Sequence, residues 1–463
     1  MSSIPKNPYL SGPLGPLYAR TALPIIFVMG MNGLLTVADA LFLGHFVGAR
    51  ALAAVTLMFP LFMLVVALAT LVASGMSSIL ARRLGADDSF GAQSVFAGAH
   101  GLALLLAAGL IVLDWVFGPA MARLAAGGDA ELARMGTIYL GITVGFSPLM
   151  FVLSVNVDTL RNEGRVGLMA AMSLLVSLAN IGFNYVLIAG LGMGVAGSAY
   201  GTAAAQALAL AIIVVFRLFG QTGLRPHALI RHGLRRHWGR ILALGAPQSL
   251  NFLGLALGSA AIMAALQWRA GDGYGATVSA YGIVTRVMTF AFLPLLGLGQ
   301  AMQSITGTNH GARRWDRADQ SLRIALVTAL AYCATVQVGM SAGAHAIGAA
   351  FVADPAVIAT VGRILPVILA MFFLAGPLMM IATYFQTIGD APRAALLGLA
   401  KPYLFAIPLT FGLAAWFGEP GIWRAGPVAE LLLLALTAAV LSRRARQTGL
   451  RLGLFHRDER HMA

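Results

Sequence analysis

Charged residues are scarce in this sequence, and cysteine is almost absent. Asp, Glu, Lys and Arg make up 10% of the 463 residues, whereas 59% are hydrophobic and the mean hydropathy is +0.83. A soluble globular domain carries about 25% charged residues, so this composition excludes one. Cys333 is the only cysteine, which excludes a disulfide within the chain and redox or metal chemistry through paired thiols.

Long apolar runs recur along the whole sequence. Each is long enough to cross a hydrocarbon core of about 30 Å as a helix, and a transmembrane β-barrel would instead show short segments of alternating polarity. We therefore predict an all-α polytopic membrane protein with twelve transmembrane helices. The expected spans are 20–45, 51–80, 92–117, 131–160, 167–190, 195–218, 240–267, 277–307, 320–345, 356–387, 393–416 and 424–443.

The formal charge of +14 is concentrated between the apolar runs. The even-numbered connections hold clusters of arginine, whereas the odd-numbered ones hold single arginines among Gly, Asp and Glu. The positive-inside rule therefore places the even-numbered connections and both termini in the cytoplasm. The basic stretch 225–240 is explained by topology and by contact with anionic membrane lipids, and nucleic acid has little support as a partner.

The sequence contains an internal repeat. A shift of 226 residues superposes Ser78 on Ser304 and Gly85 on Gly311, and a shift of 225 superposes Gly164 on Gly389. Six spans return the chain to the side where it started, so the two halves have the same orientation and a pseudo-two-fold axis along the membrane normal follows. We expect an N-lobe over residues 1–220 and a C-lobe over 221–463.

Asp39 lies inside the first apolar run, in "TVADALFLG". A carboxylate near the centre of a membrane helix costs about 2.5–3.5 kcal/mol on insertion scales, so such residues usually face inward and are functional. An apolar environment favours the neutral carboxyl group, so Asp39 could hold a proton and release it when the site becomes wet. The alternative is a buried structural acid.

Enzymatic chemistry has no visible basis in the sequence. No H-E-x-x-H or G-x-S-x-G motif occurs, and His45, His100, His310 and His345 are dispersed. We therefore expect a protein that is not an enzyme and that needs no cofactor and no metal site.

Three stretches carry a resemblance to a known family. They are "LPIIFVMGMNGLLTVADALFLG", "NIGFNYVLIAGLGMGVAGSAYGTAAAQ" and "SAYGIVTRVMTFAFLPLLGLGQAMQSITGTNHGARR". The sequence resembles the multidrug and toxic compound extrusion (MATE) family, in its DinF-like branch, over residues 14–447. The resemblance implies two six-helix bundles flanking a cavity that opens alternately to each side of a bacterial inner membrane. It also implies a monomeric secondary antiporter that exports amphipathic, often cationic, drug-like compounds.

The resemblance also implies roles for individual residues. Asp39 matches the proton-coupling acid of the family, and Pro24 matches a hinge. Asn180 and Asn184 share a helical face because they are four residues apart, but the family usually has aspartate where this chain has Asn184. Asn32 lies two turns before Asp39 and is expected on the same face. The other matching polar positions near this pocket are Tyr139, Asn156 and Thr202. An interhelical packing contact remains the alternative for each polar residue.

The coupling ion and the C-lobe leave alternatives open. Sodium-coupled relatives carry acids in the seventh and tenth spans, where this sequence has "NFLGLALGSAA" and "FFLAGPLMMIATYF" without a carboxylate. Hard cations need several oxygen ligands, so a proton gradient is favoured over sodium, although a residual sodium site around Asp39 remains open. Arg286 and Glu430 are candidates either for a C-lobe cavity or for structural pairs. A lipid-linked precursor flippase of the same superfamily is the other alternative.

Overall fold

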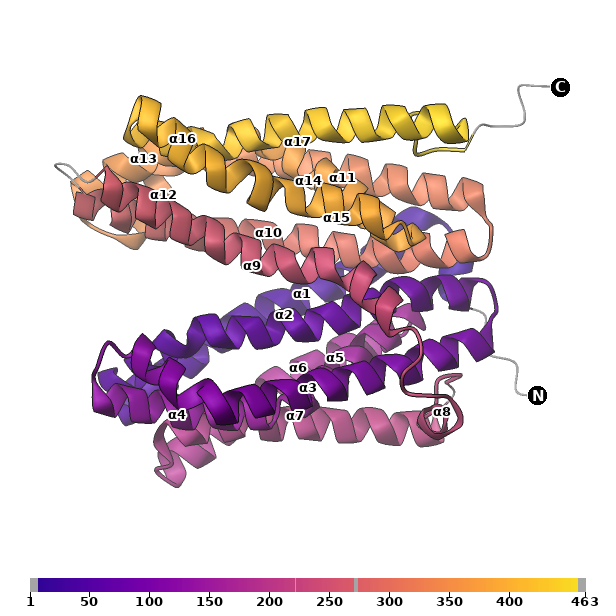
Figure 1. Ribbon diagram of the computed structural model, residues 1–463, viewed down its shortest axis with the longest axis horizontal. Coiled ribbons are helices and arrows are strands. Elements are labelled where there is room, and N and C mark those ends of the chain that lie inside the picture. The colour runs from indigo at the N-terminus through magenta and orange to yellow at the C-terminus, as the bar shows by residue number, and fades with distance from the viewer. Residues whose placement is uncertain (1–6, 221, 270–273, 457–463) are drawn as a thin grey trace. The chain divides into compact units, whose positions relative to one another are not determined.

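The computed structural model describes residues 7–220, 222–269 and 274–456, except for the side chains of Leu34, Thr36 and Val37. The described chain is almost entirely helical and forms two compact units (Figure 1). Unit 1 contains the described residues up to Gly12 and Ala19–Ser249, and unit 2 contains Pro13–Tyr18 and the described residues from Leu250 onward. The lobe boundary expected at residue 220 stays a prediction. The basic tail is described up to His456, and its last residues lie outside the described part.

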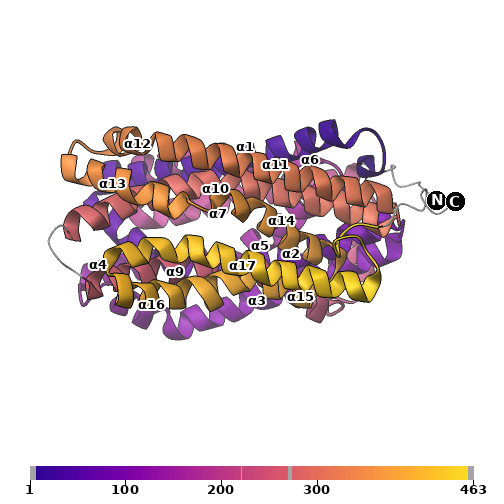
Figure 2. The same cartoon turned by 90° about the horizontal axis from the view of Figure 1, so that it is seen from above.

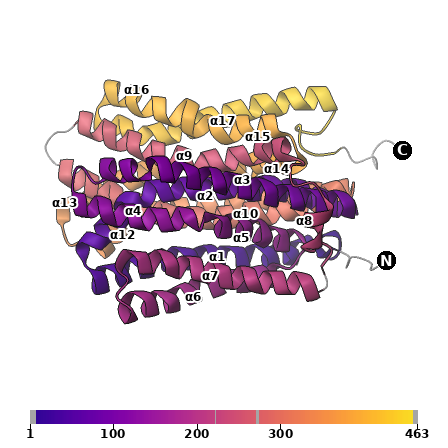
Figure 3. The ribbon, with the colours of Figure 1, turned by 60° about the horizontal axis from the view of Figure 1, so that its bottom comes forward.

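Unit 1 is a bundle of long helices, in which α6 and α7 lie side by side (Figure 3). Its elements are η1 (Pro8–Leu10), α1 (Leu14–Phe42), the π-helical η2 (Leu43–Val47), α2 (Ala49–Gly85), α3 (Ser89–Ala125), α4 (Ala130–Gly145), α5 (Ser147–Asn162), α6 (Val166–Asn184), the π-helical η3 (Tyr185–Gly190), α7 (Gly194–Phe219) and α8 (His227–Arg231).

Unit 2 follows the same pattern, and α16 and α17, in yellow, lie side by side (Figure 2). Its elements are α9 (Trp238–Trp268), whose first turns belong to unit 1, α10 (Tyr274–Gly311), α11 (Trp315–Ala342), α12 (Ala344–Phe351), α13 (Pro355–Leu369), α14 (Phe372–Ile388), α15 (Ala391–Leu399), the π-helical η4 (Ala400–Ala406), α16 (Ile407–Phe417) and α17 (Glu419–Thr448).

The structure has twelve membrane spans when each bent pair of helices is counted as one span. Ten described helical segments are long and apolar enough to cross a membrane. Two further spans are bent, by 46° between α4 and α5 and by 44° between α13 and α14. A proline near the start of α5 accounts for the first break, because proline is favoured in the first turn of a helix and disrupts a helix interior. The predicted all-α class with twelve spans is confirmed.

The internal repeat is visible in the backbone. Asp87 has a φ of 54° between α2 and α3, and Arg313, 226 residues later, has a φ of 57° between α10 and α11. Gly164 and Gly389 end α5 and α14 with φ angles of 78° and 89°. Left-handed φ values are uncommon without glycine, so their recurrence at one spacing shows that the two halves share the same turns as well as the same helices.

Aspartates in the connections fix where several helices begin. Asp88 accepts a hydrogen bond from the Gly91 amide at 2.8 Å and also pairs with Arg83. The Gly91 amide and the Arg83 guanidinium hold the pKa of Asp88 below its usual range. An N-terminal cap satisfies amides that the helix leaves free. The aspartates that cap helices in this way are Asp88, Asp129, Asp354 and Asp390.

The connector from Thr222 to His237 packs closely against α3. A Cβ atom on Gly98 or Gly101 of α3 would overlap the carbonyl oxygen of Arg236 or Leu234. The Trp238 indole donates to the Gly98 carbonyl oxygen at 2.9 Å. Glycine is therefore required at both α3 positions, because only a helix surface without side chains lets the connector backbone approach this closely.

Candidate functional site

Asp39 lies in a polar cluster formed by α1, α6 and α7. The side-chain amide of Asn184 donates to Asp39 Oδ1 at 2.6 Å and to Asn180 Oδ1 at 3.1 Å. Asn180 and Thr202 Oγ1 are in hydrogen-bond contact at 2.8 Å. The structure therefore joins four of the sequence-predicted residues in one chain of hydrogen bonds. Asn180 and Asn184 are fully buried.

The absence of a side chain at Gly201 of α7 leaves room for this cluster. A Cβ atom on Gly201 would overlap Asn184 Oδ1, so Asn184 lies directly against the α7 backbone. Asn184 Oδ1 is buried and has no hydrogen-bond partner among the described residues. A buried amide oxygen without a partner is costly, and it is a free acceptor beside the Asp39 carboxyl group.

The Asn180 amide can point in two directions. The atom of this amide that faces Asp39 lies 2.9 Å from Asp39 Oδ1. If that atom is nitrogen, it donates to an ionised Asp39, and the Asn180 oxygen accepts from the Thr202 hydroxyl. The hydrogen bond from Asn184 to Asn180 is then lost, because two amide nitrogens face each other. If it is oxygen, the contact is a hydrogen bond only when Asp39 carries a proton, because two oxygens need one hydrogen between them. Each orientation therefore suits one charge state of Asp39.

The remaining predicted residues of the N-lobe lie at different distances from this cluster. Tyr139 is half-buried on α4 and interacts electrostatically with Asp39. Asn32 is exposed on α1 and accepts from the Ser177 hydroxyl of α6 at 3.4 Å. Pro24 lies within α1, which continues through it as one helix. The proposed roles of these residues stay predictions.

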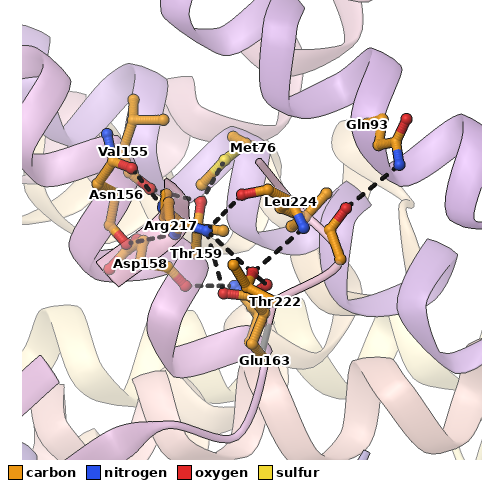
Figure 4. A network of polar contacts seen from close by, with 12 residues as sticks. Met76, Gln93, Val155, Asn156, Asp158, Thr159, Glu163, Arg217, Thr222 and Leu224 are labelled. Atoms are coloured by element: carbon orange, nitrogen blue, oxygen red, sulfur yellow. Dashed lines mark hydrogen bonds and ion pairs between the residues drawn. The ribbon is translucent and has the colours of Figure 1, made fainter. Parts of the chain in front are cut away.

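Asn156 belongs to a second polar network, shown in Figure 4. Arg217 Nε donates to Asn156 Oδ1 at 2.8 Å, and Asn156 Nδ2 donates to His100 Nε2 at 3.0 Å. His100 Nδ1 lies 2.8 Å from the Phe96 carbonyl oxygen. Because Nε2 accepts and Nδ1 must donate, His100 is the neutral tautomer with its proton on Nδ1.

Arg217 fixes the start of the connector to this network. Its guanidinium donates to the Leu224 carbonyl oxygen at 2.8 Å and pairs with Glu163 at 3.3 Å. Thr222 also donates to Glu163 (Figure 4). Arg217 is 1% exposed, so these partners compensate a buried charge. The sequence places Arg217 beside a basic connection but does not reveal Asn156 and Glu163 as its partners, because they lie 61 and 54 residues away in the chain.

Unit 2 contains an ion pair between the half-buried Lys401 of η4 and the buried Glu430 of α17. The sequence singled out Glu430 but did not identify Lys401 as its partner. Arg286 is exposed on α10 and forms no ion pair within the described part of the chain. Among the described residues, no three His, Cys, Asp or Glu side chains gather as a metal site.

Comparison with known proteins relates this geometry to a family. The family model MatE matches residues 24–186 and 247–411. The FAD transporter of Shewanella oneidensis is 25% identical over 430 residues, covering 92% of this chain and 93% of that protein. The multidrug export protein MepA of Staphylococcus aureus is 24% identical over 426 residues, covering 91% of each.

Solved structures have the same fold. An outward-facing multidrug resistance MATE transporter superposes with a TM-score of 0.85 at 22% identity, covering 97% of this chain and 99% of that one. A superfamily transporter from Pyrococcus furiosus, described as having a binding pocket of reverse polarity, superposes with a TM-score of 0.82 at 22% identity, covering 94% and 97%. Both repeats of the chain lie within the family match. The chain therefore belongs to the MatE family, the multidrug and toxic compound extrusion exporters.

Proposed function

We propose that this transporter exports amphipathic, often cationic, drug-like compounds in exchange for protons. The observation that carries the proposal is the Asp39 cluster, in which an intramembrane acid contacts the amide of Asn184 and neighbours Asn180. An acid in a membrane helix is expensive and is usually retained for function. The relatives named above are transporters, so the proposal includes no enzymatic step. We further propose a monomer in a bacterial inner membrane with both termini in the cytoplasm.

Proton exchange would reverse the direction of the hydrogen-bond chain. With Asp39 ionised, the Asn180 nitrogen donates to Asp39, and the Thr202 hydroxyl donates to the Asn180 oxygen. With Asp39 protonated, the acid donates to the Asn180 oxygen, the Asn180 nitrogen donates to Thr202, and the Thr202 hydroxyl turns to the Ser198 carbonyl oxygen, 3.2 Å away. One proton on α1 therefore changes which bonds α6 and α7 make.

This reversal links the proton to a cationic substrate. An ionised Asp39 attracts a cation in a medium of low dielectric constant, whereas a protonated Asp39 does not. A proton entering from outside would therefore release the cation, and loss of that proton inside would restore the site. Exchange of the two ligands needs no cofactor beyond the proton gradient.

Sodium coupling is the second candidate, and one observation favours it. Asn184 Oδ1 is a buried acceptor without a partner beside the Asp39 carboxyl group. Carboxylate and amide oxygens are typical ligands of hard cations. A sodium ion could therefore use these oxygens, although the cluster offers one carboxylate. The relative named as a FAD transporter adds an anionic nucleotide as an alternative substrate class. A flippase for lipid-linked precursors is the remaining alternative function.

Efflux from proteoliposomes tests the proposal. Vesicles loaded with a fluorescent organic cation receive a proton gradient or a sodium gradient, and dye efflux is followed. We expect the proton gradient alone to drive efflux, and Asp39→Asn to lower it to the level of empty vesicles, because asparagine keeps the size but cannot titrate. Asp114→Asn makes the same substitution in another membrane helix, α3, and should leave efflux unchanged.

Three outcomes would contradict the proposal. Efflux driven only by sodium would favour the second candidate. Normal proton-driven efflux by Asp39→Asn would make Asp39 structural. Selective transport of a flavin nucleotide, or of a lipid-linked precursor, in the same vesicles would replace the substrate class.

A further inference from the structure

Residues 449–456, which follow α17 with the sequence "GLRLGLFH", fold back as a compact turn. The Arg451 amide donates to the Phe455 carbonyl oxygen at 2.8 Å, and the Phe455 amide donates to the Arg451 carbonyl oxygen at 3.0 Å. Between them, Leu452 and Gly453 have φ angles of 53° and 68°, and consecutive positive φ values are typical of tight turns. Phe455 is 8% exposed, so the turn packs against the protein.

The turn contacts three helices of unit 2. The His456 amide donates to Asp319 Oδ2 of α11 at 2.6 Å, and the His456 ring Nδ1 donates to Asp319 Oδ1 at 3.1 Å. The Tyr384 hydroxyl of α14 donates to a carbonyl oxygen of the turn at 3.3 Å. The Arg444 guanidinium of α17 donates to the Gly453 carbonyl oxygen at 2.8 Å. The start of α11 and the ends of α14 and α17 therefore meet at this turn.

The connector of unit 1, from Thr222 to His237, is bound in the same way. Arg217 near the end of α7 donates to the Leu224 carbonyl oxygen at 2.8 Å, seven residues later (Figure 4). Arg444 near the end of α17 donates to the Gly453 carbonyl oxygen at 2.8 Å, nine residues later. Each guanidinium also lies over an aromatic ring of its own unit, at 5.1 and 5.0 Å from the ring centroid. In both units, an arginine of the last long helix binds the backbone that follows it.

A histidine completes the likeness between the two segments. Gln93 of α3 and Asp319 of α11 are separated by 226 residues, which is the shift of the internal repeat. His232 Nε2 of the connector donates to Gln93 Oε1 at 3.2 Å, as His456 donates to Asp319. Each histidine ring also packs against an aromatic ring in the first turn of the same helix, with centroids 4.7 and 4.8 Å apart. The two segments therefore dock on repeat-related positions.

We propose that residues 449–456 are a strap that fixes the start of α11 to the ends of α14 and α17. It is the counterpart of the connector, which contacts α3, α7 and the residue that ends α5 in unit 1. The strap is a conformational device, because the three helix ends that it joins cannot separate while it is docked. The inference concerns no transported compound and no coupling ion, so it does not depend on the proposed function.

Two glycines of the strap allow its docking to be tested. A Cβ atom on Gly453 would lie 2.3 Å from the Leu441 carbonyl oxygen of α17, so even a methyl group would push the strap away from the helix. Gly449 has nearly the same φ angle, 70° against 68°, but its Cβ atom would meet no other atom of the described structure within 4 Å. Alanine strains the backbone at either position, and only at Gly453 does it also block the contact.

Hydrogen exchange of the full chain in detergent, followed by mass spectrometry, measures whether the strap is docked. We expect the amides of residues 451–456 to exchange at least about tenfold faster in Gly453→Ala than in Gly449→Ala, because only the first substitution overpacks the contact with α17. The start of α11 and the end of α14 should also exchange faster in Gly453→Ala, because the strap no longer joins them. The remaining membrane helices should keep their protection, which shows that the variant is folded.

A second pair of substitutions gives the same test from the other side of the contact. Asp319→Ala removes the acceptor of two hydrogen bonds from the strap, whereas Asp316→Ala removes an exposed acid of the same helix. Only Asp319→Ala should free the strap. Combined with Gly453→Ala it should add little, because both substitutions act by undocking one segment. In unit 1, Gln93→Ala should speed exchange in the connector.

Two results would overturn the inference. The first is equal exchange of the strap amides within each pair of folded variants, which would mean that the contacts with α11 and α17 do not hold the strap. The second is faster exchange confined to the strap while the ends of α11 and α14 stay protected, which would mean that the strap does not join these helices.

Discussion

At the scale of single residues, hydrogen bonds from neighbouring amides offset the free-energy cost of placing the Asp39 carboxyl group in a membrane helix. A carboxyl group surrounded only by aliphatic side chains would have no hydrogen-bond partner, whereas Asn184 donates to Asp39 at 2.6 Å and Asn180 can donate at 2.9 Å. A carboxylate that accepts amide hydrogen bonds is stabilised relative to one without them. The cluster can therefore hold Asp39 in either charge state, as a carrier of protons requires.

Restoring an acid at position 184 should change the pH response of transport. Asn184→Asp puts a second carboxyl group within hydrogen-bond distance of Asp39, and two such groups share one proton because both cannot easily ionise together. We expect export to persist, with its pH optimum moved to more alkaline pH by about one unit. Proton-driven dye efflux measured across a range of pH values tests this expectation.

Asn184→Ala is the control for that experiment, because it removes the amide without adding an acid. It should weaken transport and move the optimum upward by less than Asn184→Asp does, because it removes a donor to the ionised Asp39 but adds no second carboxyl group. An unchanged optimum in a folded Asn184→Asp protein would mean that position 184 is not electrostatically coupled to Asp39.

The sequence predicts some members of the Asp39 cluster better than others. The spacing of Asn180 and Asn184 places both on one helical face, and the family resemblance brings them to Asp39. Asn156 could not be placed in this way, because its partner Arg217 is 61 residues away and approaches through the packing of α5 against α7. Pairing of Lys401 with Glu430 likewise depends on the register between two helices, which no sequence pattern specifies.

At the scale of elements, glycines decide how closely helices approach. A Cβ atom on Gly245 of α9 would overlap the carbonyl oxygen of Leu71 on α2, and one on Gly75 of α2 would overlap that of Ile241 on α9. Glycine removes the side chain that would separate two backbones, which is a common basis of helix packing in membranes. The two positions make a reciprocal contact between the start of α9 and α2.

Gly245→Ala should therefore loosen this contact. We expect the substitution to destabilise the protein by about 1–3 kcal/mol, because the added methyl group forces the two helices apart. Gly239→Ala is a matched control in the same helix, where a Cβ atom meets nothing within 4 Å, and its effect should stay within about 0.5 kcal/mol. Thermal unfolding in detergent compares the two variants, and equal stability would contradict the contact.

Element boundaries show where sequence patterns stop being informative. Apolar runs predict the spans because each must cover the same membrane thickness, and 131–160 and 356–387 were correctly predicted as single spans. Their bends of 46° and 44° were not predicted, because a bend changes direction without interrupting hydrophobicity. The π-helical segments η2, η3 and η4 were also missed, because they alter hydrogen-bond spacing without changing residue type.

At the scale of the whole molecule, the distribution of arginine predicts which ends of the helices face the cytoplasm. Cys333 is the only cysteine and is buried, so Cys333→Ala gives a background for single-cysteine labelling. Ile230 in α8 is 91% exposed, and Leu191 between η3 and α7 is 65% exposed. We expect a membrane-impermeant maleimide to label Leu191→Cys in intact cells and Ile230→Cys only after permeabilisation. Labelling of Ile230→Cys in intact cells would refute the topology.

The two compact units exchange the beginnings of their first helices. Pro13–Tyr18 of α1 belong to unit 2, where the Tyr18 hydroxyl donates to the Ser321 carbonyl oxygen at 2.9 Å, while the turns of α9 up to Ser249 belong to unit 1. If the gene is cut between the repeats, after residue 220, the N-terminal fragment lacks the last segment of unit 1 and carries Pro13–Tyr18 of unit 2. The C-terminal fragment lacks Pro13–Tyr18 and carries the turns of α9 that belong to unit 1. Neither fragment holds every segment of its own compact unit, so we expect the N-terminal and the C-terminal fragment each to fold poorly when it is expressed alone.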